Sequence, residues 1–138
     1  MKFLLPLIPL LAITTSFAME TNATSLTLPG SGWKVITLAG QTPLADHPIT
    51  FAFDAEGNIT GDTSCNRFGG DCQIEGDKIK VGLLRSTRRA CQADVMQQEH
   101  RFLALLGVVT SWSIEGNELV LTTPDGVVKA ERQAPSAE

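Results

Sequence analysis

Short segments that alternate between apolar and polar residues, separated by turn-forming residues, recur along most of this chain. In one of them Ile49, Phe51 and Phe53 alternate with polar or small residues, which is the period of a half-buried strand. Asp54 to Asn58 follows as a turn before the next such segment begins. The predicted strands cover residues 33–38, 49–53, 59–62, 71–75, 78–82, 110–114, 118–122 and 127–132.

One segment between these strands has helical spacing instead. Its face is formed by Val95, Glu99, Phe102, Leu103 and Leu106. Asp94 with Gln97 predicts a capping box, and Gly107 predicts the end, so we expect a helix over 94–106. Strands, one helix and then strands predict an α+β fold. We expect a curved antiparallel β-sheet, partly open and barrel-like, with one packed amphipathic helix.

The first eighteen residues have the three parts of a secretory signal peptide. Lys2 is followed by an apolar run from Phe3 to Ile13, and Ser16-Phe17-Ala18 provides small residues at a cleavage site. The apolar run is shorter than the roughly 20 residues that a membrane-spanning helix needs. No cysteine lies near the expected cut, so a lipid anchor is not indicated. We expect a periplasmic or secreted protein with no transmembrane segment after cleavage.

The expected organisation is one domain with short flanking segments. Residues 1–18 are the signal peptide, 19–32 a flexible tether, 33–132 the folded domain and 133–138 a disordered tail. The chain has 11 basic and 15 acidic residues, a formal charge of −4, which disfavours binding to nucleic acid. The one local basic cluster, Arg85 with Arg88 and Arg89, reads as a solvated loop or strand edge. We expect a monomer.

Three cysteines allow at most one internal disulfide in an exported chain. Cys72 alternates in register with Ile74, which is typical of a small buried residue on a strand. Cys65 and Cys91 lie at the edges of predicted elements, where a bridge distorts little. Closing that loop of roughly 26 residues would stabilise the fold by about 3.5 kcal/mol. The position of both residues at element edges favours Cys65–Cys91, and it leaves Cys72–Cys91 and Cys65–Cys72 open as alternatives.

Signals for catalysis or for a cofactor are weak. The two histidines are His47 and His100, and His100 is expected to face solvent, so a cysteine–histidine pair is disfavoured. The spacing of Cys65 and Cys72 does not match a zinc site, and no phosphate-binding glycine loop is present. We therefore predict no catalytic residues, no metal and no cofactor.

Two sequence boxes resemble a known family. Gly61-Asp62-Thr63-Ser64-Cys65-Asn66-Arg67-Phe68-Gly69-Gly70 is followed by Ser86-Thr87-Arg88-Arg89-Ala90-Cys91 and then by the predicted helix. These boxes, with Trp33 near the start and Leu119-Val120-Leu121 near the end, resemble the META domain of HslJ-like bacterial proteins. The resemblance covers about residues 31–132. It implies an antiparallel β-rich fold with one packed helix.

The resemblance also bears on individual residues. It places cysteines at Cys65 and Cys91 and leaves Cys72 as an extra one, so we predict a Cys65–Cys91 disulfide and a buried free thiol at Cys72. It marks Asn66, Phe68, Gly70 and Thr87 as structural motif residues. From its chemistry we expect Asn66 to adopt a left-handed or turn conformation, and Phe68 to fill the core. We expect Gly69 and Gly70 to allow a bend or bulge.

The function implied by the resemblance is non-enzymatic. It is that of a soluble periplasmic protein associated with envelope, heat or drug stress, which we interpret as binding of another envelope component. Two alternatives stay open. One is a proteinaceous inhibitor similar to the lysozyme inhibitors, which an acidic loop would favour. The other is a carrier of a lipid or small hydrophobic ligand, which would need an apolar cavity between sheet and helix.

Overall fold

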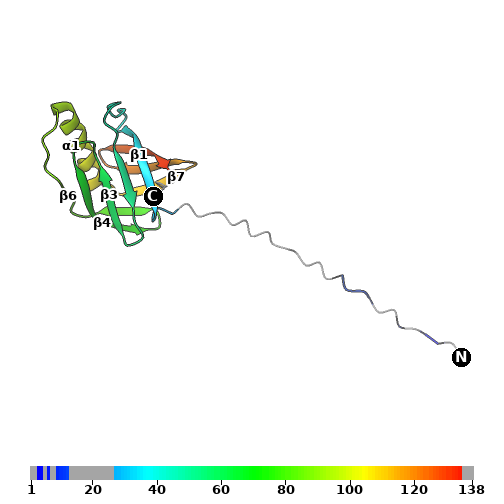
Figure 1. The fold of residues 1–138 in the computed structure, drawn as a ribbon. Coiled ribbons are helices and arrows are strands. Elements are labelled where there is room, and N and C mark those ends of the chain that lie inside the picture. The colour runs from blue at the N-terminus through cyan, green and yellow to red at the C-terminus, as the bar shows by residue number, and fades with distance from the viewer. Residues whose placement is uncertain (1–2, 5, 7–8, 13–26, 135–138) are drawn as a thin grey trace.

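The computed structural model describes residues 3–4, 6, 9–12 and 27–134 of the chain. Most of the expected signal peptide and most of the expected tail therefore lie outside the described residues. The elements are β1 (Ser31–Leu38), β2 (Thr50–Phe53), β3 (Asn58–Asp62), β4 (Arg67–Glu75), β5 (Lys78–Val81), β6 (Arg85–Ser86), α1 (Ala93–Gly107), β7 (Ser111–Glu115), β8 (Glu118–Thr123) and β9 (Gly126–Gln133) (Figure 1).

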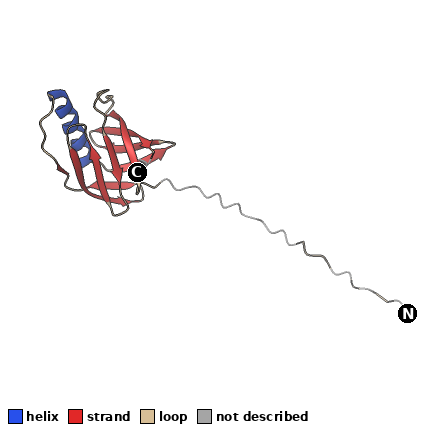
Figure 2. Ribbon diagram, in the orientation of Figure 1, coloured by secondary structure: helices blue, strands red, loops and turns tan. Residues whose placement is uncertain are grey.

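The nine strands form one antiparallel sheet that bends into a ring. Their order is β3-β2-β1-β9-β8-β7-β5-β4-β6, and a further pairing of β3 with β4 joins the two sides. The contact between β5 and β7 is the shortest, with the single register pair Lys78↔Ser111. Figure 2 shows the one helix lying against this strongly curved sheet. The expected α+β class and the curved, barrel-like sheet with one packed helix are confirmed.

The inner face of the ring is apolar because inward residues alternate with outward ones along each strand. Phe51 and Phe53 of β2 are buried, whereas Thr50 and Ala52, which alternate with them, are half-buried on the outer face. β1 keeps this alternation only as far as Val35, since the register with β9 shifts between Val35 and Thr37. The largest fully buried side chains include Trp33, Phe102, Ile49, Ile59, Leu119 and Leu121.

The strand that carries the first sequence box is longer than predicted. β4 begins at Arg67, whereas the sequence placed its start at Asp71. Gly69 and Gly70 pair with Thr60 and Ile59 of β3 and make no turn or bulge there. The sequence did not mark the short β6 as a strand. It pairs with Phe68 and Gly69 of β4, on the same edge on which β5 pairs with residues 72–75. The prediction of a bend at the two glycines is therefore wrong.

The helix covers one end of the core, and its boundaries lie close to the predicted ones. Val95, Phe102, Leu105 and Leu106 are its buried residues, while Leu103 is partly buried against the same core. The N-cap is Gln92, and its side chain makes no capping hydrogen bond. Asp94 instead accepts a hydrogen bond from the neighbouring backbone N–H of Val95 at 2.8 Å. The predicted capping box of Asp94 and Gln97 is therefore wrong.

The packed part of the chain starts earlier than residue 33. Leu28 is fully buried in the core, and β1 already begins at Ser31. Ser31 Oγ donates a hydrogen bond to the carbonyl of Leu28 and accepts one from Trp33 Nε1 at 2.7 Å. These contacts fix residues 28–32, which the sequence placed in a tether. Within the described residues, no helix has the length and apolar character needed to cross a membrane.

Candidate functional site

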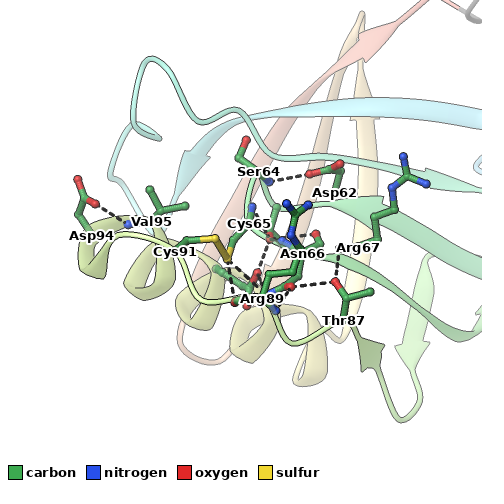
Figure 3. Close-up of a disulfide and its surroundings, with 12 residues drawn as sticks. Asp62, Ser64, Cys65, Asn66, Arg67, Thr87, Arg89, Cys91, Asp94 and Val95 are labelled. Carbon is green, nitrogen blue, oxygen red and sulfur yellow. Dashed lines mark hydrogen bonds between the residues drawn. A yellow bond between two sulfur atoms is a disulfide. The ribbon is translucent and has the colours of Figure 1, made fainter.

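The two sequence boxes meet at a disulfide. Cys65 follows β3, Cys91 precedes α1, and the two are bonded with their Cα atoms 5.9 Å apart (Figure 3). The predicted pairing is confirmed, and Cys72 is a buried free thiol. The cross-link joins two segments separated by 26 residues. It therefore holds the segment before the helix against the turn that leads into β4.

Asn66 is the centre of a hydrogen-bond network beside this disulfide. Its Oδ1 accepts hydrogen bonds from the Thr87 hydroxyl at 2.8 Å and from the backbone N–H of Arg89 at 2.7 Å. Its Nδ2 donates to the two carboxylate oxygens of Glu99, at 3.0 and 3.1 Å. Asn66 is buried, so these partners replace the water that its amide would otherwise need. One side chain thus ties together β4, the second box and the helix.

The left-handed backbone conformation, one of the two expected for Asn66, occurs at Ser64 instead. Ser64 has a positive φ of 71°, whereas Asn66 is not among the residues with positive φ. The backbone N–H of Ser64 donates to Asp62 Oδ1 at 2.7 Å, and its hydroxyl bonds the Pro48 carbonyl. These bonds stabilise the left-handed turn at Ser64. Only the left-handed alternative expected for Asn66 is therefore wrong. Asn66 closes the turn, since its carbonyl accepts the Thr63 N–H at 2.9 Å, and its side-chain amide bonds distant segments.

Glu99 anchors the helix to the first box. Its carboxylate accepts a hydrogen bond from the hydroxyl of Thr63, which is fully buried, in addition to those from Asn66. Thr63 Oγ1 in turn accepts hydrogen bonds from the backbone N–H groups of Cys65 and Asn66. The sequence did not identify this role. The available signal was an acidic residue placed on the apolar face of the predicted helix.

The remaining motif residues allow close packing. Phe68 is buried and meets Phe102 of the helix edge to face, with ring centroids 5.6 Å apart. A Cβ added at Gly61 would lie 2.6 Å from two atoms of the Phe68 ring. A Cβ added at Gly70 would lie 2.8 Å from the carbonyl oxygen of Leu83. The prediction of Phe68 as a core residue is thus confirmed, and the two glycines make room for neighbours.

The three cysteines provide no ionised thiol near neutral pH. Cys65 and Cys91 are joined, and burial raises the pKa of the Cys72 thiol to about 11, so this thiol stays protonated near neutral pH. Among the described residues, no group of three or more His, Cys, Asp or Glu side chains is placed to hold a metal ion. The arrangement at the boxes therefore positions segments of the chain.

A broad, open groove of about 1730 Å³ lies on the described surface. It crosses β2 and its neighbours between the start of β1 and the start of β4, and α1 contributes no residue to it. At one end the Arg132 guanidinium lies 4.9 Å above the ring of Trp33. Arg132 Nε and Nη2 are buried, and neither has a hydrogen-bond partner among the described residues. The groove thus combines small outward residues such as Ala52 with this stacked cation.

Comparison with known proteins agrees with the sequence resemblance. The META domain profile matches residues 24–135, which include both boxes and every strand. No curated protein matches the chain. A solved protein from Burkholderia xenovorans has a similar fold, with a TM-score of 0.64 and 25% identity over 78% of this chain and 84% of that one. A second solved protein has a TM-score of 0.63 and 20% identity over 75% of this chain and 90% of that one, which shows the fold alone.

The match extends well beyond the two boxes. It covers most of the chain, and the disulfide that joins the two boxes is the one that the resemblance implied. The chain therefore belongs to the META domain family.

Proposed function

We propose that this META-domain protein is a non-enzymatic binding protein of the cell envelope, and that its groove receives a segment of another envelope protein. The observation that carries the proposal is the use of the box residues. Asn66 and the Cys65–Cys91 disulfide join parts of the fold, and Asn66 does so together with Glu99 of the helix. A site that acts by chemistry needs a free nucleophile or base, whereas one that acts by binding needs a rigid concave surface.

The dimensions of the groove favour a protein segment as its occupant. Small-molecule pockets are typically clefts of about 300–1,000 Å³ that enclose most of the ligand. This groove is larger, about 1730 Å³, and it is broadly open, lined by outward residues such as Ala52 and by buried ones such as Phe51. Its central strand presents the small side chains of Thr50 and Ala52. A rigid floor of this kind suits an extended polypeptide.

The two alternative functions have less support. A hydrophobic carrier needs a cavity between sheet and helix, but that space is occupied by Phe102, which contacts both Phe51 and Phe68. An inhibitor needs an acidic loop free to enter a partner. Asp54 instead accepts hydrogen bonds from its own turn, from the backbone N–H groups of Glu56 and Asn58. These bonds also lower the pKa of Asp54, with those from Asn58 first among the causes.

Site-specific photo-crosslinking tests the proposal directly. A photoreactive phenylalanine analogue replaces Thr60, an exposed residue that lines the groove, in protein expressed in the native host. The matched control carries it at Ser113, an exposed residue of β7 outside the groove. We expect a discrete envelope protein to be captured from position 60 only. Capture of the same proteins from both positions, or from neither, would count against the groove. Assay of the purified protein against lysozyme tests the inhibitor alternative separately.

A role in envelope stress forms part of the same proposal and rests on family membership. Deletion of the gene should reduce growth of the host at raised temperature or with an envelope-active drug. The wild-type gene should restore growth, whereas an Ala52→Trp gene, with the groove filled, should not. Restoration by Ala52→Trp would separate any stress phenotype from the groove.

A further inference from the structure

Basic side chains gather on the outer face beside the disulfide. Arg85 of β6 pairs with Gly69 of β4, so the two share one face of the sheet. Arg67 lies two residues before Gly69 on the same strand and therefore projects from that face as well. The Thr87 N–H donates to the Arg67 carbonyl at 2.9 Å, which continues this alignment toward Arg89.

Arg67 and Arg89 line a small hollow of about 220 Å³ next to the disulfide. Figure 3 shows the Arg89 side chain beside Cys65 and Asn66, with Arg67 extending from the strand next to them. The polar groups that form the rest of its wall already have partners, except Oδ2 of Asp62, the one acidic side chain in the wall. The Thr87 hydroxyl donates to Asn66 Oδ1 and accepts from the Arg67 N–H at 3.1 Å. Asp62 Oδ1 accepts from the Ser64 N–H at 2.7 Å. The two guanidinium groups are thus the donors that remain available.

These arginines are not neutralised by ion pairs in the described part of the chain. The ion pair found there joins Lys129 to Glu118, at 3.8 Å and far along the sheet. Arg67, Arg85, Arg88 and Arg89 are all exposed. A concentration of positive charge without internal partners is unexpected in a chain with a formal charge of −4. The cluster is therefore better explained by an external anion than by stabilisation of the fold.

The backbone that carries Arg89 is held in place before any ligand arrives. Its N–H donates to Asn66 Oδ1 at 2.7 Å, and the disulfide fixes Cys91 two residues later. Arg67 is fixed at the start of β4 by its pairing with Asp62 of β3. Preorganised donors lose less conformational entropy on binding. Guanidinium groups also match the oxygens of phosphate with two parallel hydrogen bonds each.

We propose that the hollow between Arg67 and Arg89 is a phosphate-binding site, in which the two guanidinium groups hold one phosphate group. The phosphate is free or part of a small ester, or it belongs to the headgroup of an anionic phospholipid. The site needs no protein partner and does not depend on the function proposed for the groove. Arg67 and Asp62 also line the end of the groove, so a bound phosphate would lie at its margin.

The test is a titration of oxidised protein, followed by NMR signals of the arginine side chains and of the Thr87 amide. Sodium phosphate is compared with sodium chloride at equal ionic strength, and vesicles containing phosphatidylglycerol are compared with neutral vesicles by co-sedimentation. The variants are Arg67→Gln with Arg89→Gln, and Arg101→Gln as a control at an exposed helix position. Melting curves confirm that each variant is folded.

Saturable shifts with phosphate that are lost in Arg67→Gln/Arg89→Gln and kept in Arg101→Gln would support a site for free phosphate. Co-sedimentation with anionic vesicles alone, with the same dependence on the two arginines, would identify a lipid headgroup as the source. We expect the double substitution to weaken binding at least tenfold, to free phosphate or to anionic vesicles, whichever the wild-type protein binds. Binding that survives the double substitution, binding lost equally in Arg101→Gln, or no binding in either arm would overturn the proposal.

Discussion

Gly61 lies directly beneath the ring of Phe68, and this contact joins β3 to β4 where the sheet closes on itself. The two residues are register partners, and a Cβ on Gly61 would approach two ring atoms to 2.6 Å and would also meet the Thr50 carbonyl oxygen. Phe68 carries the contact inward to Phe102 of the helix. The first box therefore needs a glycine at position 61 because the Phe68 ring packs against it.

Gly61→Ala should destabilise the fold by about 1–3 kcal/mol, because the added methyl group forces the Phe68 ring or the β2 backbone to move. Gly69→Ala is the matched control on the facing strand, where a Cβ meets its nearest atoms at 3.5 Å. Its effect should stay within about 0.5 kcal/mol. Urea denaturation of oxidised protein measures both. Equal losses of stability in the two variants would show that the Gly61–Phe68 contact is not specific.

The disulfide should contribute much more to stability than the third cysteine. Cys91→Ser should lower the free energy of unfolding by about 3.5 kcal/mol, since it releases a loop that the bridge closes. Cys72→Val nearly preserves the volume of a buried side chain and should cost less than about 1.5 kcal/mol. Denaturant curves compare the variants, and peptide mapping without reductant should find Cys65 linked to Cys91. A linked peptide that contains Cys72 as the main species would refute this assignment.

Glu99→Ala should destabilise the protein by about 1.5–3 kcal/mol, because it leaves the buried groups of Thr63 and Asn66 without their charged acceptor. His100→Ala changes the next residue of the helix, which is exposed, and serves as the control. Amide hydrogen exchange should show faster opening of residues 87–91 in the Glu99 variant alone. A Glu99 variant as stable as the His100 variant would contradict an anchoring role.

Stability should fall at alkaline pH through Cys72. Burial raises its pKa from 9.0 to about 11 in the folded protein, while the unfolded thiol keeps its ordinary pKa. Between these values the unfolded state loses its proton first, so unfolding becomes easier as the pH rises. Urea midpoints of the wild type should drop over this range more than those of Cys72→Val. Parallel curves for the two proteins would mean that the thiol is not shielded by burial.

The sequence predicted most strands because their alternation is local. It missed the start of β4, since two adjacent glycines usually indicate a turn, whereas Gly70 is small here to admit the Leu83 carbonyl. It also missed β6, whose two residues are too few to show alternation. The pairing of β3 with β4 and the link from Glu99 to Asn66 depend on contacts between distant segments. Spacing alone could not predict those contacts, although an acidic residue on an apolar helix face was a usable signal.

The affinity of the protein for the partner captured through position 60 tests the central claim, which is recognition through the groove. Biolayer interferometry would compare wild-type protein with Ala52→Trp, which fills the floor of the groove, and with Ser113→Trp, which adds the same side chain to the outer face of β7. We predict that Ala52→Trp raises Kd at least tenfold, or about 1.4 kcal/mol, and that Ser113→Trp leaves it unchanged. The same Kd for the wild type and Ala52→Trp, with both folded, would contradict the claim.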